Sequence, residues 1–293
     1  MKSLDFETAR LGRILVAIAF HYDSSRFTYL STVLTSLAEF PVEKLHVTIT
    51  TNTDNQEHLL KLSSLCNLFS GLNGKSFSII YYQNLSDPLL LTWCHKHLIT
   101  DQFLGGNSQY SHFIYLEDDM KFSFGNYAYF VTYRKMLSEQ RVIPSFLRVE
   151  FSNSVGKYVN TDHENRIELS KAPKLQVDER YTFINPPNPY CAFYILDIEL
   201  ANEYVKSPSF TLNGAKSVVG WRVRELSAMA LTFENIPHGF SSRYVIPVAK
   251  QLRTTPLFSW VFHLPNNYAD GNNPFTKGHN YGTIGMDDIF SKA

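Results

Sequence analysis

The sequence lacks the features that would place it in a secreted or membrane class. Its three cysteines, Cys66, Cys94 and Cys191, follow no metal-binding or redox spacing, which favours a reducing compartment with all three as buried apolar residues. No apolar run reaches the length of a membrane span, and residues 1–13 lack the apolar core of a signal peptide. We therefore expect no integral membrane segment and a cytoplasmic location, with peripheral attachment to a membrane as an alternative.

The sequence also lacks an excess of either charge and the two best-known phosphate-binding loops. Lys and Arg number 27, and Asp and Glu also number 27. No overall field therefore draws the chain to nucleic acid, and we expect no nucleic-acid partner. Neither a Gly-x-Gly-x-x-Gly fingerprint nor a Walker lysine loop follows the first apolar run, which argues against a dinucleotide-binding or P-loop protein.

Apolar runs alternate with amphipathic segments over the first 120 residues. The pattern predicts strands near 14–20, 45–50, 77–82 and 113–116, separated by helices near 27–37, 56–69 and 88–99. This alternation is typical of an α/β fold with a mostly parallel central sheet and helices on both faces. The chain is rich in aromatic residues, with 22 Phe, 17 Tyr and 3 Trp, which fits a large core and also supplies stacking surfaces for sugars and bases.

The pattern is looser after residue 120. We predict strands near 146–151, 192–196, 244–248 and 260–264, and helices near 125–137, 198–205 and 222–232. The polar segment 152–180 is predicted to hold loops or a hairpin. Because no linker signals an independent second domain, we expect a single domain over 1–293 made of two halves, 1–120 and 121–293.

One stretch combines a buried strand with a cluster of acids. Residues Phe113 to Leu116 are apolar or aromatic, and Glu117, Asp118 and Asp119 follow them directly. Open α/β sheets bind ligands beyond the carboxyl ends of their strands, and carboxylate oxygens suit Mg²⁺ or Mn²⁺ together with a substrate phosphate. In a regular strand Glu117 and Asp119 would point to one side and Asp118 to the other. The alternative is a solvated turn at the end of the strand.

With these segments in place, the chain resembles a glycosyltransferase of the GT-A type. The resemblance rests on the first strand and turn (Ile14 to Arg26), on Leu116-Glu117-Asp118-Asp119, which is similar to the DXD motif, and on the order of the elements between them. It implies transfer of a sugar from a nucleotide-diphosphate sugar, with UDP the expected nucleotide, to a glycan or carrier-linked hydroxyl acceptor. It also implies a nucleotide-sugar-binding half over 1–120, an acceptor-binding half over 121–293, and a role in polysaccharide biosynthesis.

The resemblance assigns roles to the three acids. Asp119 is expected to hold a divalent ion, Mn²⁺ or Mg²⁺, that bridges the two phosphates of the donor. Asp118 is expected to bind the ribose or the sugar of the donor, and Glu117 to support the site or to reach the donor. The metal would stabilise the charge that develops on the departing diphosphate.

Polar residues at the ends of the first two predicted strands are further donor-binding candidates. Asp23 and Arg26 lie in the turn after the first strand, where Arg26 and the start of the next helix favour a phosphate. Thr51 and Asn52 follow the second strand and could bond the base or the ribose. The alternatives are a solvated arginine and ordinary turn hydrogen bonding.

Two residues of the second half complete the predicted site. By the resemblance, His263 is expected to complete the metal shell, with His279 as a weaker rival and a buried structural histidine as the alternative. Glu225, at the start of a predicted helix, is expected to take the proton of the acceptor hydroxyl in an inverting transfer. Glu234 and Asp197 are its rivals, and the alternative for Glu225 is an acid favoured by the helix dipole.

Two other functions remain open on the sequence. A nucleotidyltransferase that acts on a sugar phosphate would also bind a nucleotide and a metal beside a similar sheet, but it would normally show a glycine-rich phosphate loop near the first strand. A non-catalytic protein that binds nucleotides or carbohydrates would bind the donor without turnover.

Overall fold

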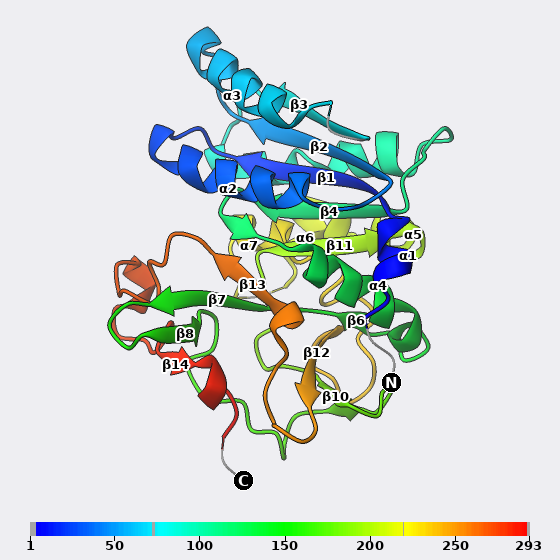
Figure 1. The fold of residues 1–293 in the computed structure, drawn as a ribbon, viewed down its shortest axis with the longest axis vertical. Coiled ribbons are helices and arrows are strands. Elements are labelled where there is room, and N and C mark those ends of the chain that lie inside the picture. Colours follow the sequence, from blue (N-terminus) through cyan, green and yellow to red (C-terminus); the bar gives the residue numbers. More distant parts are fainter. Residues whose placement is uncertain (1–3, 72–73, 219, 292–293) are drawn as a thin grey trace. The chain divides into compact units, whose positions relative to one another are not determined.

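A computed structural model describes residues 4–71, 74–218 and 220–291 of the chain. The chain forms two compact units (Figure 1). The N-terminal unit contains Phe6–Met120 and Ala192–Leu231, and the C-terminal unit contains the residues up to Asp5, Lys121–Cys191 and Thr232–Ala293. The first unit therefore includes a late segment of the chain as well as the first 120 residues. The assignment of one half to the donor and the other to the acceptor stays a prediction.

The N-terminal unit is built on a mixed sheet with the strand order β11-β4-β1-β2-β3, which Figure 1 shows edge to edge. Its strands are β1 (Arg13–Phe20), β2 (Lys44–Thr51), β3 (Lys75–Tyr81), β4 (His112–Glu117) and β11 (Phe193–Asp197). All neighbours are parallel except β11, which pairs antiparallel with β4. Because β1 lies between β2 and β4, the strand order reverses there, and such a reversal is where open α/β sheets bind ligands.

Helices of the N-terminal unit are stabilised by local caps and apolar faces. In α2 (Phe27–Ala38), the buried residues Leu30, Val33, Leu34 and Leu37 recur at helical spacing. The start of α3 (Gln56–Phe69) is capped by Asn55, whose side chain accepts the backbone N–H groups of Glu57 and His58. The remaining α-helices of this unit are α1 (Phe6–Arg10), α5 (Ile198–Tyr204), α6 (Leu212–Ala215) and α7 (Val223–Ser227).

Two predicted helices of this unit differ from the structure. Residues 88–99 do not form one α-helix: Pro88–Trp93 is a 3₁₀ helix and Leu98–Phe103 is a π-helix. Between them Lys96 packs over aromatic rings, with Nζ 4.1 Å from the ring centroid of Tyr204, so packing overrides helix propensity. The helix predicted over 222–232 ends at Ser227 as α7, and Ala230 has a φ of +40°, which a right-handed helix cannot contain.

The C-terminal unit has one long helix and two small sheets. The helix α4 (Phe124–Ser138) begins with a capping box between Ser123 and Asn126. One sheet has the order β6-β12-β10-β9, and in the other the strands run β14-β8-β7-β13. Their strands are β6 (Ile143–Pro144), β7 (Leu147–Ser152), β8 (Lys157–Asn160), β9 (Lys174–Leu175), β10 (Tyr181–Ile184), β12 (Tyr244–Ala249), β13 (Trp260–His263) and β14 (Ile284–Gly285).

The core of the C-terminal unit joins both of its sheets. Leu147 and Val149 of β7 pack in one cluster with Ile184 of β10 and with Ile246 and Val248 of β12. The segment 152–180, predicted to hold loops or a hairpin, contributes the strand β8, which pairs antiparallel with β7, the strand predicted at 146–151. In the described part of the chain, every helix is too short or too polar to cross a membrane.

Candidate functional site

The acid motif, which consists of Glu117, Asp118 and Asp119, lies at the carboxyl end of β4. The strand ends at Glu117, and Asp118 and Asp119 form the turn before the two-residue strand β5 (Met120–Lys121). The regular alternation of side chains assumed for 117–119 therefore does not apply. Both aspartates instead meet the same partner, Arg26, which follows β1 in a 3₁₀ turn (Ser24–Arg26).

Arg26 holds the two aspartates together. Its Nε and Nη2 donate to the two carboxylate oxygens of Asp118, both at 2.8 Å, and Nη2 also donates to Asp119 Oδ2 at 2.7 Å. The structure thus brings Arg26 and the acids to one place at the reversal point of the sheet. The sequence predicted that they would be neighbours, but not that the guanidinium would bind the carboxylates in a fork.

The motif is acidic and largely shielded from water. Asp118 and Asp119 are each 4% exposed. Burial raises the pKa of Asp118 to about 7, the charge of Asp119 adds to the rise, and hydrogen bonds from Arg26 oppose it. One guanidinium bridging two buried carboxylates, with Glu117 next to them in the chain, makes this a place where a further positive charge would be stabilised.

Three donor-binding candidates take part in the loops after β1 and β2. Asp23 accepts hydrogen bonds from the backbone N–H and the hydroxyl of Ser25, at 2.8 and 2.7 Å, and these lower the pKa of Asp23. Asn52 accepts the backbone N–H of Tyr22 at 2.9 Å and thereby joins the two loops. Thr51 is fully buried, and its hydroxyl has no hydrogen-bond partner among the described residues. Asp23 and Asn52 therefore stabilise turns, and the donor-binding roles of all three stay predictions.

The sequence did not indicate an aromatic stack beside these loops. The ring of Tyr22 lies on the imidazole of His58, with centroids 3.8 Å apart and planes 10° apart. His58 is in the first turn of α3, where the N–H groups of the helix start also lie. The only sequence signal was the position of Tyr22 just after the first predicted strand and of His58 at the start of the second predicted helix.

Glu225, the candidate catalytic base, caps its own helix. Its Oε2 accepts the backbone N–H of Arg222 at 2.8 Å at the start of α7. The indole N–H of Trp93 donates to the carbonyl of Val223 at 2.9 Å and connects α7 to the 3₁₀ helix Pro88–Trp93. The rival Asp197 caps α5 through the N–H of Leu200, and the rival Glu234 belongs to the C-terminal unit. The catalytic role of Glu225 remains a prediction.

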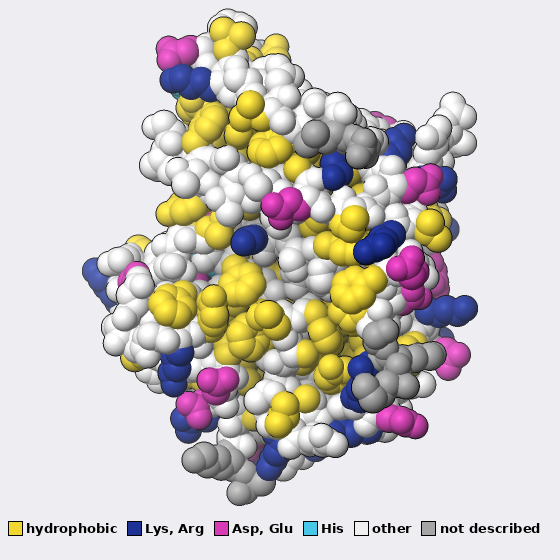
Figure 2. All heavy atoms as spheres, in the orientation of Figure 1, with side chains coloured by type: hydrophobic (Ala, Val, Ile, Leu, Met, Phe, Trp, Pro, Cys, Tyr) yellow, Lys and Arg dark blue, Asp and Glu magenta, His cyan; other side chains and the backbone are white. Residues whose placement is uncertain are grey.

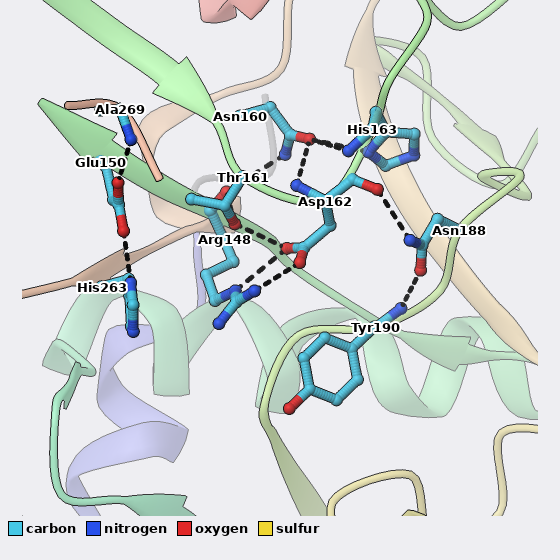
Figure 3. A network of polar contacts seen from close by, with 10 residues as sticks. All are labelled: Arg148, Glu150, Asn160, Thr161, Asp162, His163, Asn188, Tyr190, His263 and Ala269. Atoms are coloured by element: carbon cyan, nitrogen blue, oxygen red, sulfur yellow. Dashed lines mark hydrogen bonds and ion pairs between the residues drawn. The ribbon is translucent and has the colours of Figure 1, made fainter. Parts of the chain in front are cut away.

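His263, the candidate metal ligand, belongs to the C-terminal unit and is held by a carboxylate. Its Nδ1 donates to Glu150 Oε1, while Glu150 Oε2 accepts the backbone N–H of Ala269 at 2.6 Å (Figure 3). Both side chains are buried. A carboxylate on one ring nitrogen is the arrangement that orients metal-binding histidines. The rival His279 is exposed and pairs with Glu164 at 2.7 Å.

Next to this pair is a buried polar network that sequence reasoning missed. Arg148 donates to both carboxylate oxygens of Asp162, at 3.1 and 2.6 Å, and lies over the ring of Tyr190 (Figure 3). The signal was present in Leu147-Arg148-Val149-Glu150, where charged residues alternate with apolar ones in a predicted strand. Such a strand has one charged face, and buried charges require partners.

The acids of the motif fit part of a divalent-metal shell. Among the residues that the structure describes, no group of three or more His, Cys, Asp or Glu side chains is placed to hold a metal ion. Mg²⁺ and similar ions commonly bind through one or two carboxylates and take their remaining ligands from water and substrate phosphates. Asp119, the residue predicted to hold the ion, can supply one such carboxylate.

No protein-family model and no curated protein matches the chain. A solved structure, "Crystal structure of GalNAc-T7 with UDP, GalNAc and Mn2+", superposes with a TM-score of 0.51 at 11% sequence identity. The match covers 86% of this chain and 44% of that chain, so this chain spans less than half the length of that neighbour. At this identity the likeness concerns the fold alone. The chain has the predicted mixed α/β architecture and a GT-A-like fold.

Proposed function

We propose that the chain is a glycosyltransferase that moves a sugar from a nucleotide-diphosphate sugar, with UDP as the nucleotide, to a hydroxyl of a glycan or carrier-linked acceptor. The observation that carries this proposal is the buried group of Arg26, Asp118 and Asp119 at the reversal point of a parallel sheet. A structure that the chain resembles in fold contains UDP, GalNAc and Mn²⁺, which agrees with this donor class and with a divalent ion.

Binding of the donor would rearrange the charges of the acid motif. The diphosphate competes for Arg26, because a guanidinium binds phosphate as well as carboxylate in a fork. Asp119 would then hold Mn²⁺ or Mg²⁺, which when bound supplies Lewis-acid stabilisation of the leaving diphosphate. Asp118 would accept a hydroxyl of the ribose or sugar, and Glu117 would support both aspartates.

The nucleoside end of the donor would lie at the loops after β1 and β2. The buried Thr51 hydroxyl, which lacks a partner among the described residues, would gain one there. Asn52 and Asp23 would keep the loops in place for the base and ribose through their hydrogen bonds to Tyr22 and Ser25.

The acceptor hydroxyl must lose a proton as its oxygen attacks the anomeric carbon. Glu225 would take that proton in an inverting transfer, after exchanging its hydrogen bond from Arg222 for one from the acceptor. Glu150 orients the imidazole of His263 within the C-terminal unit, and the metal-binding role of His263 stays a prediction from the sequence.

Release of UDP from a panel of UDP-sugars, with Mn²⁺ and then with excess chelator, tests the proposal. We expect metal-stimulated release that Asp119→Asn reduces at least about a hundredfold, as expected when a main stabiliser of leaving-group charge is lost. Glu225→Gln should abolish transfer to an added acceptor and leave donor binding intact. The matched control is Glu43→Gln, because Glu43 is exposed and precedes β2 at its amino end, whereas the acids follow β4 at its carboxyl end.

Three outcomes would contradict the proposal. Unchanged activity after chelation would remove the metal and the role of Asp119. Release of pyrophosphate from a nucleoside triphosphate and a sugar phosphate would indicate a nucleotidyltransferase. Tight binding of UDP-sugars without turnover, with every acceptor class tested, would indicate a binding protein.

A further inference from the structure

A large cavity lies entirely within the C-terminal unit. Its volume is about 820 Å³, and its walls come from residues 162–173, 185–188 and 239–241 and from Tyr281. Cavities of 300–1,000 Å³ are typical of sites for small organic ligands. This one is large enough for an oligosaccharide of a few rings, and none of the residues predicted to bind the donor lines it.

Acidic and basic side chains at the cavity wall are equal in number, because Asp162, Glu164 and Glu168 are matched by Arg148, which binds Asp162, and by Arg166 and Lys171. Asp162 is neutralised by the buried Arg148, Glu164 pairs with His279 at 2.7 Å, and Glu168 pairs with Lys171 at 2.7 Å. The wall therefore offers no concentrated positive charge to a phosphate or sulfate group. Amide, hydroxyl and carboxylate groups remain as hydrogen-bonding partners, and these suit a neutral ligand that carries many hydroxyls.

His163 lines this cavity and has one ring nitrogen without a hydrogen-bond partner among the described residues. Its Nδ1 donates to Asn160 Oδ1 at 2.8 Å, because that oxygen already accepts the backbone N–H groups of Asp162 and His163 (Figure 3). The lone pair is therefore on Nε2, which is buried and has no hydrogen-bond partner among the described residues. Burial lowers the pKa of His163 to about 4, so the ring stays neutral at pH 7. A buried acceptor without a partner is costly unless a ligand or water meets it.

The walls are held in place before any ligand arrives. Asn185 Oδ1 accepts both the N–H and the hydroxyl of Ser241, at 2.7 and 2.9 Å, and fixes the turn that carries Phe240. Asn188 donates to the carbonyl of Asp162 at 2.7 Å and accepts the N–H of Tyr190 at 3.0 Å. Fixed walls reduce the entropy that a ligand would lose on binding. The half-buried rings of Phe240 and Tyr281 add apolar faces beside these polar groups.

We propose that this cavity is a binding site for a neutral oligosaccharide, with a sugar hydroxyl donating to His163 and a sugar ring packed on Phe240. Oligosaccharide binding at this site does not depend on the proposed transfer reaction. If that reaction is correct, the bound oligosaccharide is the acceptor glycan.

The test is direct binding by calorimetry, with the full chain, without donor or metal. The probes are neutral oligosaccharides of two to four hexose or N-acetylhexosamine units, and sulfated or uronic-acid oligosaccharides of the same length. We expect neutral oligosaccharides to bind, Phe240→Ala to weaken binding about tenfold, and Phe240→Trp to retain it. His163→Phe should weaken it comparably, since the ring stays and the acceptor is lost.

A matched control removes an aromatic ring elsewhere in the same unit. Hydrophobic side chains gather over β7 and β13 (Figure 2), where Tyr158 is 41% exposed and packs edge-on against Phe151 and Phe262. We expect Tyr158→Ala to leave affinity unchanged. Circular dichroism shows whether each variant is folded. If Phe240→Ala does not fold, the comparison of Phe240→Trp with His163→Phe tests the site instead.

Several results would overturn the inference. They are the absence of binding by every neutral oligosaccharide, binding of acidic oligosaccharides alone, or loss of affinity in Tyr158→Ala with no change in the Phe240 and His163 variants. UDP release in the absence of acceptor is measured separately. If no UDP is released, the proposed transfer reaction is wrong, but the proposed oligosaccharide site is not affected. Oligosaccharide binding without UDP release would therefore support this site and reject the transfer reaction.

Discussion

Replacing Arg26 by glutamine should destabilise the fold, because it leaves the two aspartates of the acid motif without their positive partner. The guanidinium lies 2.7–2.8 Å from oxygens of Asp118 and Asp119, whose side chains are 6% exposed. Removing one partner of a buried ion pair costs about 3–5 kcal/mol. Because the Arg26 side chain is 32% exposed, water screens part of its charge, and we expect a loss near the lower end, about 3 kcal/mol at pH 8.

The cost of Arg26→Gln should depend on pH, because protonation of Asp118 relieves the missing charge. The folded-state pKa of Asp118 is raised to about 7 from its ordinary value of 3.8. Between these values the folded state holds a proton that the unfolded state releases, so stability from this group falls as the pH rises. Without Arg26 the pKa of Asp118 rises further, and this window extends to higher pH. We expect Arg26→Gln to cost less at pH 5, where Asp118 is protonated and the contact with Asp119 is the main loss, than at pH 8.

Urea unfolding at pH 5 and pH 8, followed by circular dichroism, measures both quantities. Adding Asp118→Asn should restore part of the lost stability at pH 8, because one of the two adjacent charges is gone. The control is Arg13→Gln, since Arg13 and Glu43 form an exposed pair 4.0 Å apart and should contribute less than about 1 kcal/mol. Equal losses at both pH values, or a loss no larger than that of the control, would refute the reasoning.

Three further predictions concern buried groups and backbone strain, and each is measured by urea unfolding. Because the pKa of His163 is about 4 in the fold against 6.5 ordinarily, its own contribution to stability should fall by about 2 kcal/mol between pH 7 and pH 5, and His163→Gln should remove that part of the pH dependence. Asn160→Ala should cost at least about 3 kcal/mol, because it removes the acceptor of three hydrogen bonds and a donor, all buried. Gly74→Ala should cost more than Gly71→Ala, because both have positive φ but only at Gly74 would a Cβ meet a backbone oxygen, at 2.6 Å. Equal costs for the two glycine variants, the same change in stability between pH 7 and pH 5 in His163→Gln as in the unchanged protein, or a near-neutral Asn160→Ala would contradict these expectations.

The elements of the N-terminal unit could be predicted because their signals are local. The run Ile14–Phe20 is apolar at every position since β1 is buried on both faces, and α3 occupies the predicted residues Gln56–Phe69 because an asparagine cap precedes an apolar periodicity. The placement of acids at the end of β4, next to the turn after β1, followed from the expected strand order. That placement required no knowledge of side-chain contacts.

The remaining features depend on contacts between distant residues. Arg26 and Asp118 are 92 positions apart, and Glu150 and His263 are 113 apart, so no local pattern encodes either pair. The turn at Asp118 replaced the assumed regular strand because Arg26 gathers both aspartates on one side. Periodicity over 222–232 also could not reveal that Ala230 would adopt a left-handed conformation and end the helical region.

The antiparallel strand β11 has a consequence for the order in which the chain can fold during synthesis. Residues Phe193–Asp197 cover the outer edge of β4, so a nascent chain that stops before them leaves that edge, and the acids beyond it, without its neighbouring strand. Bare edges of this kind recruit other chains. A ribosome must therefore complete the intervening Lys121–Cys191 segment before the earliest sheet can close, and a fragment ending at residue 191 should precipitate where the whole chain stays dispersed.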